Sequence, residues 1–175
     1  MQMNPKYFFE NYVIPNYDEF CNDEGNIRKA FNAVISLASM PDNYFNYYER
    51  RGSPCIRPYL TSVKRNDKER QKENLITFKS YLGSLSSYFI DIQSMSNAYK
   101  HLYTNAGSAY VSVESGGAVF VQDEENGDDD IDTDELKPAY CSKVYYTANI
   151  ANNSQTYTVK EALESMITVW KTLVE

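Results

Sequence analysis

Apolar side chains recur with a helical period through the first hundred residues of the chain. From residue 27 to residue 38 they fall at three- and four-residue intervals, which places them on one face of a helix. This face consists of Ile27, Ala30, Phe31, Val34, Ile35 and Ala38. Asn26 precedes the run as an N-cap residue. An aromatic pattern over residues 4 to 20 predicts an earlier helix, which Pro15 is expected to break or kink.

Two more helices are expected before residue 105. A turn at residues 52 to 54 is followed by a charged helix that starts near Asn66 and continues through Leu82. The next helix covers residues 85 to 104, and its apolar stripe consists of Leu85, Phe89, Ile92, Tyr99 and Tyr103. The pattern as a whole predicts a helical bundle over residues 4 to 105.

The period then changes from helical to alternating. Valines alternate on both sides of Gly116 and Gly117, which is typical of a β-hairpin, and residues 139 to 150 and 155 to 157 predict further strands. The predicted antiparallel β-insertion spans residues 109 to 157 and includes an acidic loop at residues 122 to 137. Thr158 and Glu161 have the spacing of a capping box, which predicts a closing helix over residues 158 to 174.

These elements predict one α+β domain over residues 1 to 175, a helical bundle followed by a small antiparallel sheet and a C-terminal helix. A chain of 175 residues can bury a core of its own. Runs of strands that follow runs of helices indicate segregated elements rather than alternating βαβ units.

Charge is unevenly distributed along the chain. The net charge is -7, yet residues 50 to 79 carry nine basic groups against three acidic ones, while residues 123 to 135 carry nine acidic groups and no basic one. A basic segment can attract phosphate groups, or it can be the solvated face of a helix and loop. The candidate binding residues of this segment are Arg50, Arg51, Arg57, Lys64 and Arg65.

The only histidine of the chain, His101, lies on the helix expected at residues 85 to 104. Gln93, Asn97 and His101 are spaced by four residues, so they form a row on one helix face, and Lys100 is adjacent. Asn97, Lys100 and His101 are therefore candidates for general acid–base chemistry, in which histidine titrates near neutral pH and lysine holds an anion. The same residues also suit an ordinary polar helix face.

Several classes of protein receive no support from the sequence. Phosphate-loop, dinucleotide-binding and α/β-hydrolase motifs are missing, and no apolar run reaches the length of a membrane-spanning helix. The acidic loop does not have the glycine and glutamate spacing of an EF-hand, so no metal and no cofactor is expected. Three widely separated cysteines indicate free thiols and a cytoplasmic protein.

Three segments resemble the HEPN-like proteins, a group of small bacterial and phage-encoded proteins. The run from Ile92 to Leu102 resembles their NA-x-KH helix, residues 28 to 37 resemble their first core helix, and residues 169 to 171 resemble their C-terminal tryptophan helix. The resemblance implies a helical bundle that is often dimeric. A homodimer is therefore expected, with the helix of residues 85 to 104 near the interface because its polar row lies beside abundant tyrosine. It also implies a defence, toxin–antitoxin or phage context.

Many HEPN-like proteins are metal-independent ribonucleases whose motif joins an arginine to a histidine. By this resemblance His101 would be the motif histidine and Asn97 a polar motif residue, but no arginine lies between Tyr88 and His101. Two functions therefore remain open: a non-catalytic module that binds protein or RNA, and a ribonuclease that uses His101 as general acid or base. Tyrosine-rich surfaces suit protein partners, and the basic segment suits RNA.

Overall fold

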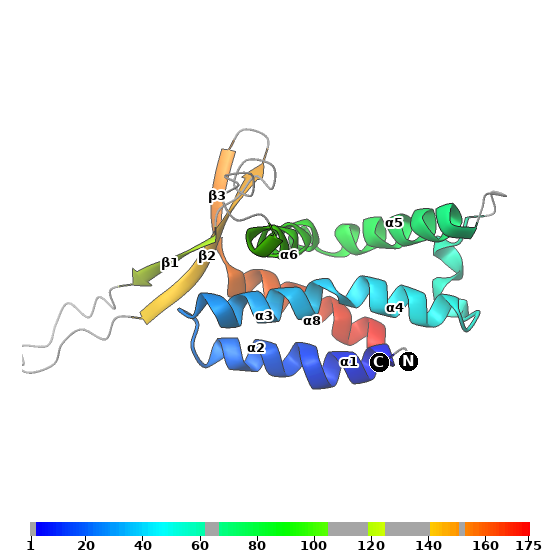
Figure 1. The fold of residues 1–175 in the computed structure, drawn as a ribbon, viewed down its shortest axis with the longest axis horizontal. Helices are drawn as coiled ribbons and strands as arrows, with labels where there is room; N and C mark the ends of the chain where they lie inside the picture. Colours follow the sequence, from blue (N-terminus) through cyan, green and yellow to red (C-terminus); the bar gives the residue numbers. More distant parts are fainter. Residues whose placement is uncertain (1–2, 62–66, 105–118, 125–140, 151–152) are drawn as a thin grey trace, which may run out of the picture.

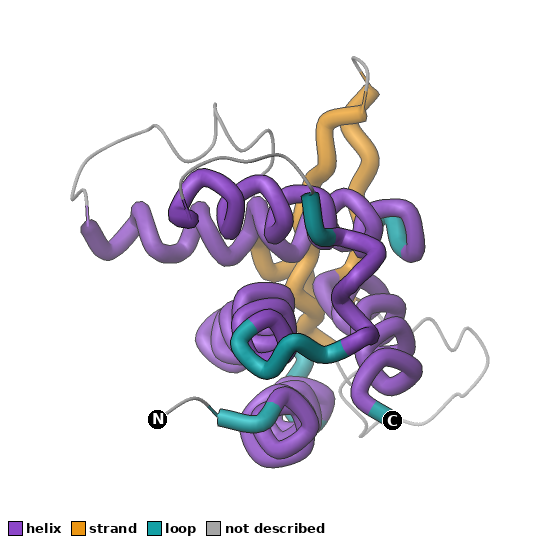
Figure 2. The backbone as a smooth tube through the Cα atoms, turned by 90° about the vertical axis from the view of Figure 1, so that its right-hand side faces the viewer, coloured by secondary structure: helices purple, strands orange, loops and turns teal. Residues whose placement is uncertain are grey.

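The computed structural model describes residues 3 to 61, 67 to 104, 119 to 124, 141 to 150 and 153 to 175. It shows the α+β fold that the sequence predicts, with packed helices, a small antiparallel sheet and a C-terminal helix. Figure 1 places the sheet at one end of the helical bundle and the short helix η2 (Pro54–Tyr59) at the other, and Figure 2 views the molecule from that second end.

The predicted break at Pro15 does not occur, because the N-terminal helical segment continues past this residue. Helix α1 (Pro5–Phe8) continues through the π-helical turn η1 (Phe9–Val13) into α2 (Ile14–Cys21). A proline ring inside a helix clashes with the carbonyl four residues earlier. The wider π-helical turn immediately before Pro15, in which the Ile14 N–H bonds to the Phe9 carbonyl, lets the chain continue as a helix.

The next two helices follow almost without a break. Helix α3 (Ile27–Ala38) begins at the predicted N-cap, where the Asn26 side chain accepts a hydrogen bond from the Lys29 N–H. Helix α4 (Met40–Glu49) starts two residues later with Pro41 in its first turn, a position where proline is tolerated. The 3-10 helix η2 (Pro54–Tyr59) follows the turn at Gly52.

A short break separates helix α5 (Asp67–Leu85) from helix α6 (Tyr88–Thr104). The assignment of Leu85 to the apolar stripe of the second helix was wrong, because Leu85 ends α5 and is 45% exposed. The chain turns at Ser86, which is buried and forms a hydrogen bond of 2.8 Å with the Ser165 hydroxyl. This contact with the C-terminal helix α8 (Val159–Val174) fixes where α6 begins.

The sheet has three antiparallel strands in the order β1-β2-β3, namely β1 (Val119–Glu124), β2 (Cys141–Ile150) and β3 (Asn153–Thr158). Strand β1 includes residues 122 to 124, so the predicted acidic loop begins too early by these residues. They pair with residues 141 to 143 of β2, and this backbone pairing outweighs their acidic side chains. The first half of the predicted hairpin and the remainder of the acidic loop lie outside the described residues.

Helix α8 (Val159–Val174) closes the domain from the predicted capping box. The Thr158 hydroxyl accepts from the Glu161 N–H, and the Glu161 carboxylate accepts from the Thr158 N–H. This reciprocal pair satisfies donors that would otherwise be unpaired at the helix start. The helix then packs against α3 and α6, and in the described part of the chain no helix is long and apolar enough to cross a membrane.

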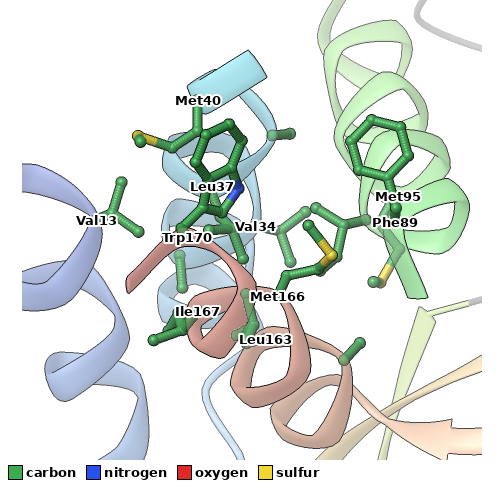
Figure 3. Packing of buried hydrophobic residues seen from close by; sticks show 14 of the residues in the cluster. Val13, Val34, Leu37, Met40, Phe89, Met95, Leu163, Met166, Ile167 and Trp170 are labelled. Atoms are coloured by element: carbon green, nitrogen blue, oxygen red, sulfur yellow. The ribbon is translucent and has the colours of Figure 1, made fainter. Parts of the chain in front are cut away.

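The hydrophobic core lies between α8, α3 and α6 (Figure 3). Trp170 of α8 is fully buried, and its ring centroid lies 5.6 Å from that of Tyr44 on α4 and 6.4 Å from that of Phe78 on α5. Leu163 and Met166 are two further large side chains of α8 that are fully buried. Each such side chain contributes about 1.5–3 kcal/mol through burial, so α8 fastens the helices together.

Candidate nucleic-acid interface

The turn that follows α4 presents two of the candidate arginines, Arg50 and Arg51. The turn closes with two hydrogen bonds of 3.0 Å, from the Ser53 N–H to the Tyr48 carbonyl and from the Gly52 N–H to the Glu49 carbonyl. This pair of bonds is a Schellman motif, and it requires the left-handed φ of +61° that Gly52 adopts. Both arginines are exposed, and cations are favoured at the C-terminal end of a helix.

The chain after this turn is held in place by Asn74 of α5. Its side-chain oxygen accepts a hydrogen bond of 2.8 Å from the Thr61 N–H, and its amide group donates to a Glu49 oxygen at 3.4 Å. Asn74 is only 1% exposed. It thus joins the end of α4, helix α5 and the segment that follows η2. Between these points Ile56 is fully buried, which fixes η2 on the bundle and leaves Arg57 exposed.

We call Arg50, Arg51 and Arg57 together the basic end. None of the three forms an ion pair with a carboxylate in the part of the chain that the structure describes, whereas Lys79 in the same basic segment pairs with Asp42 at 2.9 Å. The carboxylate nearest in sequence, Glu49, is half-buried and receives the bond from Asn74. The basic end therefore presents three positive charges that no carboxylate of the described residues pairs with. Lys64 and Arg65 lie outside the described residues.

Tyrosines under the basic end remain uncharged at physiological pH. Burial raises the pKa of Tyr48, and burial also raises the pKa of Tyr59 to about 12, with neighbouring Tyr81 adding to the effect. Arginine does not deprotonate in this range either. The positive charge of this surface is consequently independent of pH across the neutral range.

Arg51 differs from the other two arginines because it lies against an aromatic ring. Its guanidinium carbon is 3.6 Å from the centroid of the Tyr47 ring, and one guanidinium nitrogen donates to the Tyr47 carbonyl at 3.1 Å. Tyr47 in turn makes an edge contact with Tyr48, at a centroid distance of 5.1 Å. The Arg51 side chain is therefore ordered in a single position by two contacts.

The predicted row of polar residues on α6 has a different setting. The Gln93 amide donates a hydrogen bond of 3.0 Å to the Ala38 carbonyl, so this member of the row joins α6 to the end of α3. Asn97 is exposed. Lys100 and His101 belong to α6, and their side chains lie outside what the structure describes. Figure 1 shows α6 away from the end of α4 and from η2, so the structure does not bring the two predicted sets into one site.

A half-buried acid, Asp91, also lies on α6, where it faces the sheet. The Tyr146 hydroxyl of β2 donates a hydrogen bond of 2.9 Å to Asp91, and Tyr146 is 3% exposed. Burial raises the pKa of Asp91 above its ordinary value, and the hydrogen bond from Tyr146 partly opposes the shift. Tyr157 of β3 packs beside Tyr146, with centroids 5.8 Å apart. The hydrogen bond between Tyr146 and Asp91 joins the sheet to helix α6 of the bundle.

Sequence reasoning missed Asn74 and Tyr47. A signal for Asn74 exists, because residues 74, 78 and 82 form a row at four-residue spacing that is otherwise apolar. A polar residue in such a row indicates a buried hydrogen-bonding role. No comparable signal exists for Tyr47, since many tyrosines surround it in the sequence.

Metal chemistry has no candidate site in the described ranges, where no three His, Cys, Asp or Glu side chains gather. Comparison with known proteins finds no family model, no curated protein and no solved structure that matches this chain.

Proposed function

We propose that this chain is a non-catalytic, HEPN-like interaction module that binds RNA through the basic end. The observation that carries the proposal is that Arg50, Arg51 and Arg57, on a turn and a short helix, are exposed and form no ion pair with a carboxylate of the described residues. Arginines held in this way offer charge-assisted hydrogen bonds to phosphate oxygens. Binding at phosphates releases counterions and so gives an affinity that falls steeply with salt.

A cytoplasmic RNA-binding protein would have thiols in the reduced state. Cys21 and Cys55 are both free, and Cys55 is exposed. An exposed free thiol suits a reducing compartment. This observation supports the cytoplasmic location that the proposal requires, in a defence, toxin–antitoxin or phage setting.

The test is a salt titration of binding to a labelled single-stranded RNA pool by fluorescence anisotropy. Each phosphate contact contributes about −0.7 to the slope of log affinity against log salt. Replacing all three arginines of the basic end by glutamine should therefore make the slope shallower by about 2. Wild-type protein that does not bind RNA at about 50 mM salt, where phosphate contacts are strong, would refute the proposal.

A matched control removes the same charge elsewhere. Lys6, Arg28 and Lys171 are exposed basic residues outside the basic segment, and a triple glutamine variant at these positions has the same net charge as the test variant. We expect this control to retain nearly all of the RNA affinity and salt slope. An equal loss in both variants would show that net charge, rather than the basic end, determines binding.

We propose in addition that the chain forms a homodimer, with α6 near the interface. Ile90 at the start of α6 is 66% exposed, and an exposed aliphatic side chain on this helix is suited to burial in an interface. Light scattering at high micromolar concentration should give twice the monomer mass, and Ile90→Asp should return the monomer mass. A wild-type monomer at that concentration would remove this part of the proposal.

A further inference from the structure

The guanidinium group of Arg51 is a planar surface with one covered side. The 3.6 Å separation from the Tyr47 ring centroid is a stacking distance, so one face of the guanidinium lies on the ring. The hydrogen bond to the Tyr47 carbonyl fixes its position in the plane. Because Arg51 is exposed, the second face is accessible to solvent.

The ring under Arg51 is itself connected to the core. Tyr47 contacts Tyr48 edge to face, Tyr48 contacts Tyr44 at a centroid distance of 4.7 Å, and Tyr44 is 5% exposed and packs on Phe78 at 5.5 Å. This series of aromatic contacts limits the motion of Tyr47. Arg51 therefore loses side-chain freedom before any ligand binds, and a ligand that uses it does not have to order it.

We infer that the outer face of the Arg51 guanidinium is a stacking platform for an unpaired RNA base, while Arg50 and Arg57 hold the flanking phosphates. The inference rests on the proposed RNA-binding function and specifies its ligand as single-stranded RNA. Bases stack on aromatic side chains and on arginine planes when they are unpaired, whereas a duplex keeps its base faces covered. Arg50 and Arg57 have no ring contact among the described residues, so only Arg51 is prepared for stacking.

A competing explanation gives Arg51 a structural role only. A cation at the end of α4 is favoured by the helix dipole, and its contact with Tyr47 would then stabilise the turn without contacting a ligand. Lysine at position 51 would serve the dipole equally well and would carry the same charge. It cannot stack as a plane, so a lysine substitution separates the two roles.

The experiment compares wild type, Arg51→Lys and Arg50→Lys in binding two oligomers of equal length and charge. One is single-stranded oligouridine, and the other has the same sugar–phosphate backbone without bases. Stacking of one base predicts that wild type prefers the base-bearing oligomer by about 5- to 100-fold. Arg51→Lys should lose most of this preference, and Arg50→Lys should keep it. Tyr47→Leu, which removes the supporting ring, should resemble Arg51→Lys.

Each outcome distinguishes this inference from the function on which it rests. If wild type binds both oligomers equally and the two lysine variants behave alike, RNA binding stands and the platform is refuted. If duplex RNA of the same length binds as tightly as oligouridine, the platform is refuted as well. If wild type binds neither oligomer at low salt, the proposed function fails and the platform fails with it. Thermal unfolding of each variant verifies that the comparison is made between folded proteins.

Discussion

Asn74→Ala is a direct test of how the bundle positions the basic end. The substitution removes the acceptor of the Thr61 N–H and the donor to Glu49, and it leaves the main chain of α5 unchanged. Alanine also has the highest helix propensity, so a loss of stability could not be attributed to a weaker helix. The expected loss therefore comes from the two hydrogen bonds of a side chain that is 1% exposed.

The magnitude follows from the geometry of each bond. A buried donor without an acceptor costs about 1–3 kcal/mol. Thr61 is only half-buried, so water can partly replace the lost acceptor and the cost lies in the lower half of that range. The contact with Glu49, at 3.4 Å, is long and adds little. We expect a loss of about 1–2 kcal/mol, which for a chain of this length lowers Tm by about 2–8 °C.

A second substitution at position 74 should make the loss of folding stability depend on pH. Asn74→Asp keeps an acceptor for the Thr61 N–H but places a second carboxylate beside Glu49. Two adjacent carboxylates raise the pKa of one of them above its unfolded value. A raised carboxyl pKa contributes stability that is complete at low pH and is lost as pH rises through that value. Asn74→Asp should therefore lose stability as pH rises above about 4, the ordinary pKa of a carboxyl group, while Asn74→Ala should not.

Thermal and urea unfolding monitored by circular dichroism measure these differences, with Ser80→Ala on an exposed position of α5 as the control. RNA affinity of Asn74→Ala should also decrease, because the segment that follows Arg57 is no longer held at Thr61. A Tm of Asn74→Ala within about 1 °C of wild type, less than the smallest expected shift, would refute the assigned role. So would a pH dependence shared equally by both Asn74 variants.

Four further predictions concern other parts of the fold. Burial raises the pKa of Asp91, so the proton on it stabilises the fold at low pH and this contribution is lost as pH rises through the raised value. Asp91→Asn should consequently gain stability relative to wild type as pH rises above about 4, the ordinary pKa of an aspartate. Urea midpoints showing the opposite trend would contradict this. Tyr146→Phe removes only the hydroxyl that donates to Asp91, and we expect it to cost about 1.5–3 kcal/mol at pH 7 in urea unfolding. Thr158→Ala removes the N-cap of α8 and should cost about 1 kcal/mol, with no change in RNA affinity, and an unchanged midpoint would show that the capping box does not form in solution. If the chain is a ribonuclease instead of a module, His101→Ala should lower the RNA cleavage rate by about 100- to 10,000-fold without lowering Tm, whereas wild type that cleaves no RNA pool would exclude this alternative for the isolated protein.

Local signals in the sequence were sufficient to predict the helix starts that depend only on nearby residues. The N-cap at Asn26 and the capping box at Thr158 form as predicted, because each needs only residues within one helical turn. The order of bundle, antiparallel strands and closing helix could also be predicted, since the periods of helices and strands differ. The exposed arginines of the basic end could be named from charge alone.

Contacts between distant segments were decided by the tertiary structure. Gln93 faces the end of α3 because the Ala38 carbonyl accepts its bond, and Leu85 is exposed because the contact of Ser86 with Ser165 turns the chain there. Strand β1 extends through Glu124 because β2 pairs with it, although the local composition favours a loop. Periodicity indicates which face of an element is apolar, but it does not indicate which distant group will form a hydrogen bond with a polar atom on that face.

The candidate site, too, was determined partly by the sequence and partly by the tertiary structure. The sequence by itself determined that basic residues gather between residues 50 and 79. Only the folded chain decided that Asp42 neutralises Lys79, that Asn74 holds Glu49 and Thr61, and that the Arg51 plane lies on Tyr47. These contacts depend on packing α4, η2 and α5 together, and that packing is set by the burial of side chains such as Trp170 from the far end of the sequence.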